Sequence, residues 1–293
     1  MNLNGTFTAL VTPFTSSGEI DGTTLQKLVE QQISSGINGL VPVGTTGESP
    51  TLTNREHHEV IKLVVNSAQG KVPIIAGCGS NNTSEALNHT KAAKDLGAKA
   101  SLHVAGYYNK PSASGFLRHF FLIADTVDLP LIVYNIPGRT GKNIDNNTML
   151  KLAEHPNIVG VKEASGNYTQ IMDLINKKPD DFVVLSGDDE ATFPIITLGG
   201  NGVISVTSNL LPKEMVKLVD LALSGQTREA RKQHYRLLPL ITALMSIDTN
   251  PIPIKAALHL NGTIEENYRL PMTPLTSTEK EKLVTILQEF GII

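Results

Sequence analysis

The sequence predicts an α/β fold, a (β/α)8 barrel followed by an all-helical extension at its C-terminus. Short apolar runs alternate eight times with longer segments of helical periodicity, and this strand signal stops after Pro212. The length of 293 residues suits a barrel with additional elements. Eight successive βα units imply a parallel sheet that closes on itself. The alternative is an open, doubly wound sheet, which usually carries a glycine-rich phosphate turn where this chain has TPFTSSGE.

The expected strands are short apolar runs without strict alternation, as is typical of parallel strands that are buried on both faces. They cover residues 6–12, 39–44, 72–78, 100–106, 130–136, 158–164, 181–187 and 202–208. Each is followed by a segment with helical periodicity. We therefore expect every strand to be covered by a helix on the outside of the barrel.

The helices between the strands have recognisable ends. Thr53 precedes the segment 55–68, Asn82 and Thr83 precede the segment 84–97, and Gly97 is a C-terminal glycine stop. Residues from 212 onward have an entirely helical pattern, with segments 212–225, 226–245, 253–262 and 277–291. We therefore expect residues 1–224 to form the barrel that carries the active site. Residues 225–293 are expected to form an extension that packs on the barrel or on another subunit.

The composition excludes several classes of protein. The charged fraction is 18% and the formal net charge is −3, so nothing attracts nucleic acid or an anionic membrane surface. The N-terminus lacks the pattern of a signal peptide, and no apolar run approaches the length of a membrane span. Cys78 is the single cysteine and is expected to be a buried apolar side chain. A cytoplasmic protein is predicted.

The loops that follow the strands should form one site, because the C-terminal ends of the strands carry the active site in barrels of this kind. The expected loops are GTTGES (44–49), GYYNKPS (106–112), YNIPGRTG (134–141), SGDDE (186–190) and VTSN (206–209). Lys162 joins them from inside the sixth apolar run, IVGVKEA. All of these groups should meet at the same mouth of the barrel.

Lys162 is the strongest catalytic candidate, because a buried ammonium costs several kcal/mol unless it gains a function or a partner. Apolar surroundings lower the pKa of a lysine and leave a neutral amine, the nucleophile required to form a Schiff base with a carbonyl substrate. The alternative is an ion pair with Glu163 or Asp188. Tyr107, Tyr108 and Tyr134, three of the six tyrosines, also fall at expected strand ends.

Tyrosine hydroxyls joined through Thr45 or Thr46 can relay the protons that imine formation requires, although aromatic packing at the rim is an equally simple explanation. The GTTGES turn offers backbone N–H groups and hydroxyls that could bind a carboxylate of the substrate. The guanidinium of Arg139 could bind a second carboxylate through two parallel hydrogen bonds. An ordinary turn and a solvated arginine are the alternatives. The acids in SGDDE argue against a phosphorylated substrate.

The eight histidines include no H-x-x-x-H pair and no strand-end cluster with carboxylates. We expect them on helix surfaces, which disfavours a zinc-dependent aldolase. GCGSNN and GRTGKN likewise lack the spacing of a dinucleotide fingerprint and of a P-loop.

At these positions the sequence resembles the pyruvate-dependent Schiff-base lyases, the family that includes dihydrodipicolinate synthase and N-acetylneuraminate lyase. The resemblance extends from FTALVTPF to LPMTPLT and rests on GTTGES, on YNIPGRTG with VKEAS, and on NPIPIKAAL. Arg139 with Thr140, the SGDD stretch and GVISVTSN favour the synthase branch over the neuraminate lyases. The implied reaction condenses pyruvate with L-aspartate-4-semialdehyde in the diaminopimelate route to lysine, without a metal or an organic cofactor.

The resemblance also implies the roles of individual catalytic residues. Lys162 forms the imine with pyruvate, and Tyr134 moves protons during imine formation and carbon–carbon coupling. Thr45 links Tyr134 to Tyr108, and in the family the tyrosine matching Tyr108 crosses a tight dimer interface. The resemblance also implies a homotetramer made of two such dimers, although dimers occur among relatives as well.

Four further residues are implied to contact the substrates. Thr46 binds the pyruvate carboxylate. Arg139 helps to hold the carboxylate of the semialdehyde and keeps Tyr134 in place. The backbones of Gly187 and Ile204 lie beside the bound substrates.

The family carries a feedback pocket for L-lysine at the same dimer interface, and lysine inhibition is expected here as well. The matching positions are Ser49, Asn54, His57, Asn81, Glu85 and Tyr107. Asn54 stands where many inhibitable enzymes have a histidine, and Ala105-Gly106 replaces the common Thr-Pro before Tyr107. The second change points to a looser placement of both tyrosines in that loop.

Three other functions stay open from the sequence. A retro-aldol lyase for a keto-sugar acid would use the same imine. Its site would need hydrogen-bond partners for the several hydroxyls of the sugar, whereas Arg139 suggests a site that binds a small, charged substrate. A regulatory barrel without catalysis would have no need for Lys162 and Tyr134. A pyridoxal-phosphate enzyme also uses a lysine imine, but it needs a phosphate cup that SGDDE does not resemble.

Overall fold

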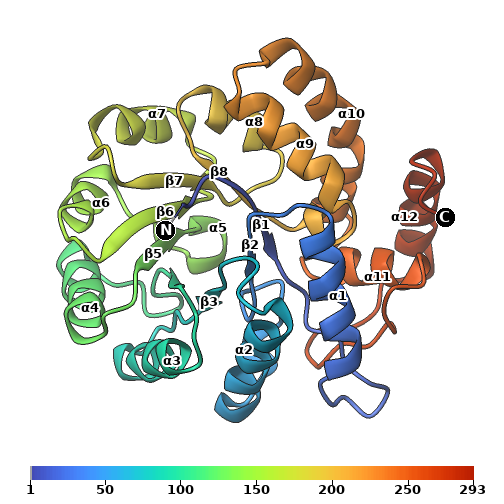
Figure 1. Cartoon of the computed structure of the whole chain (residues 1–293), viewed down its shortest axis with the longest axis horizontal. Coiled ribbons are helices and arrows are strands. Elements are labelled where there is room, and N and C mark those ends of the chain that lie inside the picture. Colours follow the sequence, from blue (N-terminus) through green and yellow to red (C-terminus); the bar gives the residue numbers. More distant parts are fainter. Residues whose placement is uncertain (1) are drawn as a thin grey trace.

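The computed structural model describes residues 2–293 and shows a ring of helices around a central set of parallel strands (Figure 1). The neighbour order is β2-β1-β8-β7-β6-β5-β4-β3. A parallel bridge between Leu40 and Ile74 joins the two ends of this order and closes the barrel. The predicted (β/α)8 fold is confirmed. Its strands are β1 (Gly5–Ala9), β2 (Gly39–Val41), β3 (Ile75–Gly77), β4 (Ala100–Val104), β5 (Leu131–Asn135), β6 (Ile158–Glu163), β7 (Val183–Ser186) and β8 (Gly202–Ser205).

Helices follow the strands around the barrel. They are α1 (Gly22–Ser34), η1 (Ser49–Thr51), α2 (Asn54–Ala68), α3 (Thr83–Asp95), α4 (Ala113–Thr126), α5 (Pro137–Thr140), α6 (Asn146–Ala153), α7 (Tyr168–Lys177), α8 (Thr192–Thr197), η2 (Thr207–Asn209), α9 (Pro212–Leu223), α10 (Thr227–Ser246), α11 (Ile252–Leu260) and α12 (Ser277–Glu289). The predicted caps are present. Thr53 forms a capping box with Glu56 at the start of α2, and the Asn82 side chain caps α3. Gly97 follows α3 with a φ of +96°.

The strands are shorter than the apolar runs that predict them. The run 39–44 contains a strand only to Val41, because Pro42 has no N–H for the ladder and Val43 takes a φ of +51°. Similarly, Pro73 lies before the first residue of β3. The apolar residues past the strand ends are buried in the loops, so hydrophobicity alone overestimates strand length.

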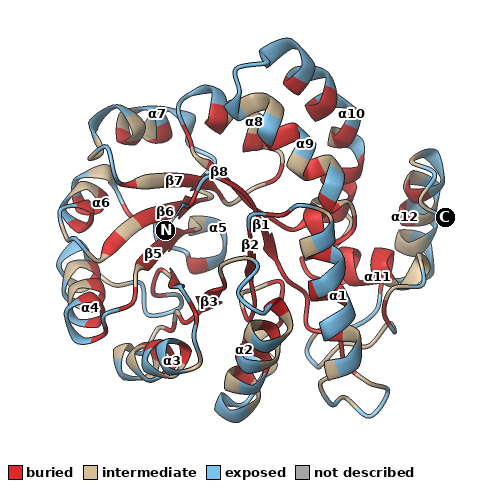
Figure 2. Ribbon diagram, viewed as in Figure 1, coloured by how far each residue is buried: buried red, intermediate tan, exposed pale blue. Residues whose placement is uncertain are grey.

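Two layers of core hold the barrel together, and the buried faces of the helices turn toward the strands (Figure 2). One apolar cluster fills the inside of the barrel and includes Phe7, Val41, Tyr134 and Ile204. Other clusters lie between the strands and the helices. Val161 belongs to such an outer cluster, so the alternation along β6 turns the next residue, Lys162, into the barrel.

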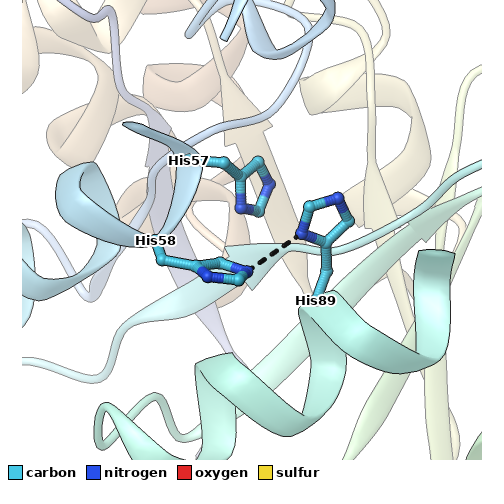
Figure 3. Close-up of side chains that lie close together, drawn as sticks. All are labelled: His57, His58 and His89. Carbon is cyan, nitrogen blue, oxygen red and sulfur yellow. Dashed lines mark hydrogen bonds between the residues drawn. The ribbon is translucent and has the colours of Figure 1, made fainter. Parts of the chain in front are cut away.

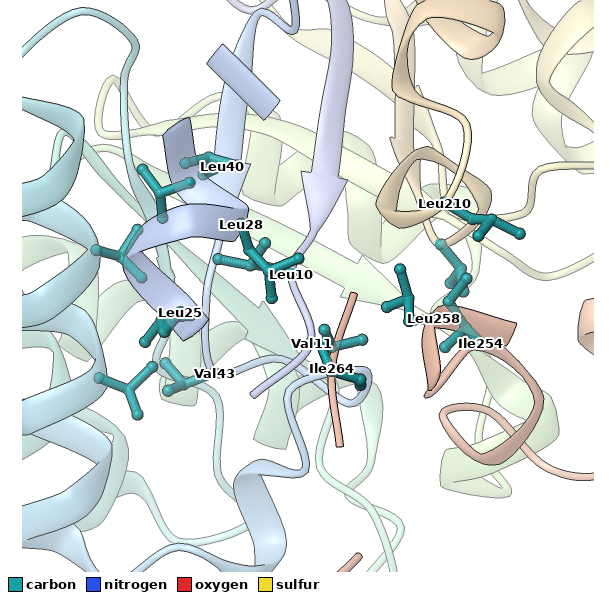
Figure 4. Close-up of a cluster of buried hydrophobic side chains, with 14 of the residues drawn as sticks. Leu10, Val11, Leu25, Leu28, Leu40, Val43, Leu210, Ile254, Leu258 and Ile264 are labelled. Carbon is teal, nitrogen blue, oxygen red and sulfur yellow. The ribbon is translucent and has the colours of Figure 1, made fainter. Parts of the chain in front are cut away.

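The C-terminal segment packs on the barrel of its own chain. Ile254 and Leu258 of α11 share one apolar cluster with Leu10 and Leu210 from the barrel (Figure 4). Residues 261–276 connect α11 to α12 without regular secondary structure, so the expected all-helical segment is interrupted there. The division of the chain at residue 224 stays a prediction. Across residues 2–293, every helix is too short or too polar to cross a membrane.

Candidate active site

Lys162 lies on the inner face of the barrel near the C-terminal end of β6. It pairs in register with Tyr134 of β5 on one side and with Leu185 of β7 on the other. The side chain is buried, and its burial lowers the pKa of the amine to about 8. The neighbouring carboxylate of Asp189 raises this pKa, while the Arg139 guanidinium lowers it further. A substantial fraction of the amine is therefore neutral near pH 8.

The ion pair that the sequence left open for Lys162 does not form. Lys162 takes part in none of the salt bridges found within residues 2–293. The carboxylate of Glu163 instead accepts hydrogen bonds from Asn135 Nδ2 at 3.1 Å and from the Ser165 N–H at 2.6 Å. Alternation along β6 directs it away from the barrel interior. Lys162 thus keeps its amine free for chemistry.

Asp189 supplies a buried negative charge near the site. Its Oδ2 atom accepts hydrogen bonds from the N–H groups of Val206 and Thr207 at 3.0 and 2.7 Å, and from the Thr207 hydroxyl at 2.8 Å. Burial raises the pKa of both Asp189 and Asp188 above their ordinary values. The acidic residues of the SGDDE loop therefore influence the charge of Lys162. Asp189 is held in place by its hydrogen bonds to the loop after β8.

Tyr134 lies against the catalytic lysine candidate. Lys162 Nζ is 4.1 Å from the centroid of the Tyr134 ring. Burial raises the pKa of the phenol above its ordinary value, so the hydroxyl stays protonated near neutral pH. A cavity of about 50 Å³ brings together Thr45, Thr46, Tyr134 and Lys162. Four of the predicted catalytic and substrate-binding residues therefore line one cavity at the mouth of the barrel.

Gly187, whose backbone is predicted to lie beside the substrates, adjoins the stem of Lys162. A Cβ atom at this position would lie 3.0 Å from Lys162 Cγ, 3.1 Å from Lys162 Cε and 2.9 Å from Ala164 Cβ. A larger residue would push the amine out of place. Ile204, by contrast, has its side chain in the apolar cluster inside the barrel. Its backbone belongs to β8, and the contact of that backbone with a substrate stays a prediction.

Asn250 is a site residue that sequence reasoning missed. Its side-chain amide donates a 2.9 Å hydrogen bond to the Thr46 hydroxyl. Its carbonyl oxygen accepts a 3.2 Å hydrogen bond from Arg139, which also reaches Thr249 Oγ1 at 3.4 Å. The residue begins the stretch NPIPIKAAL, which carries part of the family resemblance but by itself indicates no role for Asn250. The C-terminal extension thus orients two predicted substrate-binding side chains.

Lys255 and Glu48 form a second connection that sequence reasoning missed. Lys255 Nζ lies 2.5 Å from Glu48 Oε1, and both side chains are buried. The ammonium also donates a 2.7 Å hydrogen bond to the Asn267 carbonyl oxygen. Glu48 belongs to the GTTGES loop and has a φ of +53°. The buried pair therefore ties α11 to the loop that presents Thr45 and Thr46.

A second cavity of about 390 Å³ adjoins the first, and Thr45, Ser49 and Val104 line both. Arg139 lines this larger cavity. Five of the six positions expected to bind an effector line it as well, namely Ser49, Asn54, His57, Glu85 and Tyr107. The sixth, Asn81, donates a 3.3 Å hydrogen bond to the Tyr107 carbonyl oxygen. The structure therefore brings the predicted effector set next to the predicted catalytic set.

Tyr108 is the predicted site residue that the single chain does not bring to the lysine. Its side chain is 90% exposed, and it lines neither of the two cavities. Its φ of +68° turns the backbone of the loop after β4. Within one chain, the relay expected to run from Tyr134 through Thr45 to Tyr108 is incomplete.

The expectation that the histidines lie on helix surfaces is wrong. His57, His89, His103 and His234 are buried. His103 lies within β4, while His57 of α2 and His89 of α3 face each other between these helices. The sequence does not reveal this burial, because the neighbouring residues are polar. A helix that packs against both a sheet and another helix has a buried face wider than its stripe of apolar residues. Cys78 is buried as predicted, and burial raises its pKa.

Known proteins share both the sequence and the fold of this chain. The family model described as the dihydrodipicolinate synthetase family matches residues 2–290. A relative from Maridesulfovibrio salexigens, named 4-hydroxy-tetrahydrodipicolinate synthase, is 48% identical over 100% of both chains.

Two solved structures agree with this match. The dihydrodipicolinate synthase of Acinetobacter baumannii, described as chloride inhibited and complexed with pyruvate, is 45% identical, with a TM-score of 0.98 over 100% of both chains. The enzyme of Cyanidioschyzon merolae, solved with lysine bound, is 41% identical, with a TM-score of 0.96 over 99% of both chains. The chain therefore belongs to the dihydrodipicolinate synthetase family.

Proposed function

We propose that this protein is an enzyme, a carbon–carbon lyase of the class I aldolase type, that condenses pyruvate with L-aspartate-4-semialdehyde as a 4-hydroxy-tetrahydrodipicolinate synthase does. The observation that carries the proposal is Lys162, a buried amine outside every ion pair described, with a lowered pKa and a place in the wall of a cavity at the barrel mouth. Family membership and the names of full-length relatives at 48–49% identity support the choice of reaction.

The chemistry begins with the neutral amine. Lys162 attacks the ketone carbon of pyruvate, and the carbonyl oxygen leaves as water when the imine forms. The protonated imine nitrogen then accepts electrons, so the methyl carbon loses a proton and becomes an enamine. Tyr134, whose hydroxyl stays protonated, donates and retrieves the protons in these steps.

The second substrate completes the reaction. The enamine carbon attacks the aldehyde of aspartate semialdehyde and forms the new carbon–carbon bond. The amine of that substrate then displaces Lys162 from the imine carbon and closes the ring, which regenerates the free lysine. Because the lysine supplies the electron sink, the reaction as proposed consumes neither a metal nor an organic cofactor.

Substrate recognition follows from the groups around the two cavities. In the proposed roles, Thr46 binds the pyruvate carboxylate and Arg139 holds the carboxylate of the semialdehyde near the larger cavity. Gly187 leaves space for the Lys162 stem, and its backbone lies beside the substrate together with that of Ile204. The hydrogen bonds from Asn250 to Thr46 and from Arg139 to Asn250 support these assignments by fixing both side chains.

An assembly of subunits is part of the proposal. Tyr108 is 90% exposed on the loop after β4 and is absent from the cavity of its own chain. We propose that it inserts next to Thr45 and Tyr134 of a neighbouring subunit in a tight dimer, and that two dimers form a homotetramer. L-Lysine is the proposed inhibitor in the larger cavity, as supported by the lysine-bound relative. A cytoplasmic location is also proposed, in keeping with the single free thiol.

Trapping the imine tests the mechanism. The protein is incubated with pyruvate, reduced with borohydride and mapped by peptide mass spectrometry, with a sample without pyruvate as the control. We expect one pyruvyl adduct per chain, on Lys162. An adduct on another lysine, or no adduct, would contradict the proposed mechanism.

A variant of Arg139 tests the second substrate. Arg139→Ala should form the pyruvate adduct normally but lose most of its coupling activity with the semialdehyde, because one carboxylate clamp is missing. Arg236→Ala is the matched control, since this arginine pairs with Glu214 on a partly exposed surface. Normal turnover of the semialdehyde by Arg139→Ala would remove the main support for this substrate.

A further inference from the structure

Three histidines converge between two helices on the outside of the barrel. His57 and His58 come from α2 and His89 comes from α3, and their rings turn toward one another (Figure 3). One ring nitrogen of each residue lies within 4.8 Å of the others. His58 Nε2 is 3.2 Å from His89 Nδ1, and the rings of His57 and His89 are 4.1 Å apart between centroids.

One buried ring nitrogen of this cluster has no partner in the described part of the chain, while His58 Nε2 and His89 Nδ1 form a hydrogen bond with each other. His57 Nδ1 is buried and has no hydrogen-bond partner among the described residues. A buried polar atom without a partner is costly, so such an atom calls for an explanation. Within residues 2–293, no carboxylate joins the three rings as a member of the cluster. Glu85 lines the same cavity as His57 and His89, and its carboxylate accepts a 2.5 Å hydrogen bond from Ser80.

The three imidazoles offer ring nitrogens of the kind that a transition-metal ion binds. Neutral imidazole nitrogens are preferred ligands for Zn²⁺ and for neighbouring transition metals, whereas Mg²⁺ and Ca²⁺ prefer oxygen.

The spacing is close to that of a three-histidine site. Ligand nitrogens at tetrahedral Zn²⁺ lie roughly 3.4 Å from each other, since each bond is about 2.0–2.1 Å long. The distance between His58 and His89 already meets this requirement. The remaining distances between ring nitrogens reach up to 4.8 Å, so the rings have to close by up to about 1.4 Å. His58 is only half-buried, which leaves its side chain free to make this adjustment.

The cluster is also reachable by an ion. His58 lines a surface depression of about 410 Å³ together with Arg55 and Glu59. His57 and His89 line the cavity of about 390 Å³ on the other side. A metal held by the three rings would thus have a path from solvent on one side. Its fourth coordination position would open on the larger cavity.

We propose that His57, His58 and His89 bind one divalent transition-metal ion of the Zn²⁺ class, with an open position that faces the larger cavity. The ion takes no part in the imine chemistry. It offers a ligand position to a water molecule, a carboxylate or an amine in that cavity. Simple packing of three neutral rings is the competing explanation, and it predicts no metal affinity.

Cobalt is a suitable probe because it takes zinc sites and absorbs visible light. The full-length protein, stripped of metal with a chelator, is titrated with Co²⁺. We expect one Co²⁺ per chain and the intense absorption of four-coordinate cobalt. His58→Gln and His89→Gln should each weaken binding by about tenfold or more, because each removes a ligand. His155→Gln is the matched control, since that histidine pairs with Asp125 elsewhere on the surface.

A second measurement needs no variant and so does not depend on their folding. Bound Zn²⁺ should protect His58 from modification by diethyl pyrocarbonate, with His155 modified equally with and without the metal. Equal Co²⁺ affinity in all variants, an absence of binding, or a failure of Zn²⁺ to protect His58 would overturn the proposal. None of these readouts involves pyruvate, so their outcome is separate from that of the borohydride test.

Discussion

Tyr134 and Lys162 stand opposite each other on neighbouring parallel strands, with the Lys162 amine 4.1 Å from the centre of the Tyr134 ring. Because paired residues of parallel strands point to the same face, both side chains enter the barrel at the same level. The phenol packs against the lysine and excludes water from one side of it. The register between β5 and β6 therefore places the candidate nucleophile, Lys162, and its candidate proton donor, Tyr134, in one cavity.

The first prediction concerns the pH dependence of imine formation. Only the neutral amine attacks a carbonyl, and the pKa of Lys162 is about 8. The initial rate of borohydride-trapped adduct formation at a fixed, low pyruvate concentration should therefore rise with pH and level off above pH 8. A rise centred near the ordinary lysine value of 10.5 would show that the burial has no such effect.

The second prediction is that Lys162→Met stabilises the protein while abolishing adduct formation. The folded-state pKa is below the ordinary value of 10.5. The unfolded chain therefore binds more protons between pH 8 and 10.5, and stability rises with pH in that window. Methionine has no charge and so removes the free-energy cost of burying the ammonium. The free energy of unfolding at pH 7 should therefore increase by up to about 3 kcal/mol.

Urea unfolding at pH 7 and at pH 10 measures this effect. The difference between wild type and Lys162→Met should shrink at the higher pH, where the folded-state amine is neutral and the unfolded one has begun to lose its proton. A gain that is equal at both values would instead point to better packing by methionine. A loss of stability would indicate that the amine makes favourable contacts that outweigh its burial.

The third prediction concerns Asn250 as a positioning residue. Asn250→Ala removes the hydrogen bond to the Thr46 hydroxyl. A net hydrogen bond is worth about 1 kcal/mol, so the KM for pyruvate should rise roughly fivefold with a smaller change in kcat. If Asn250 acts through Thr46, then Thr46→Val and the double variant should show effects that are not additive. Additive effects would mean that the two residues act independently.

The fourth prediction concerns the buried pair of Lys255 and Glu48. Lys255→Met leaves the Glu48 carboxylate buried without its cation, which should cost about 3–5 kcal/mol of stability in denaturant unfolding. Adding Glu48→Gln should recover much of this loss. Lys177→Met is the control, because its pair with Asp173 is largely exposed and its loss should change stability little. A small effect of Lys255→Met would contradict this role of the pair.

The sequence by itself determined the barrel and its catalytic lysine candidate. Eight apolar runs separated by helical segments are a local, repeated pattern, and parallel pairing of neighbouring units follows from it. Lys162 was visible because a lysine inside an apolar run violates that pattern. Thr45, Thr46 and Arg139 were found because the ends of the strands meet at one mouth. The ends of the strands were misjudged, since Pro42 and Val43 leave the ladder while remaining buried.

Only the tertiary structure decided which distant groups support the site. Asn250 contacts Thr46 across 204 positions, and Lys255 contacts Glu48 across 207. The burial of His57 and His89 likewise depends on how α2 packs against α3. Local periodicity determines which face of a helix or strand is apolar. It does not indicate which polar atom of another element will lie against that face. That choice is made by packing, because a buried polar group is stable only next to the particular partner that the fold brings to it.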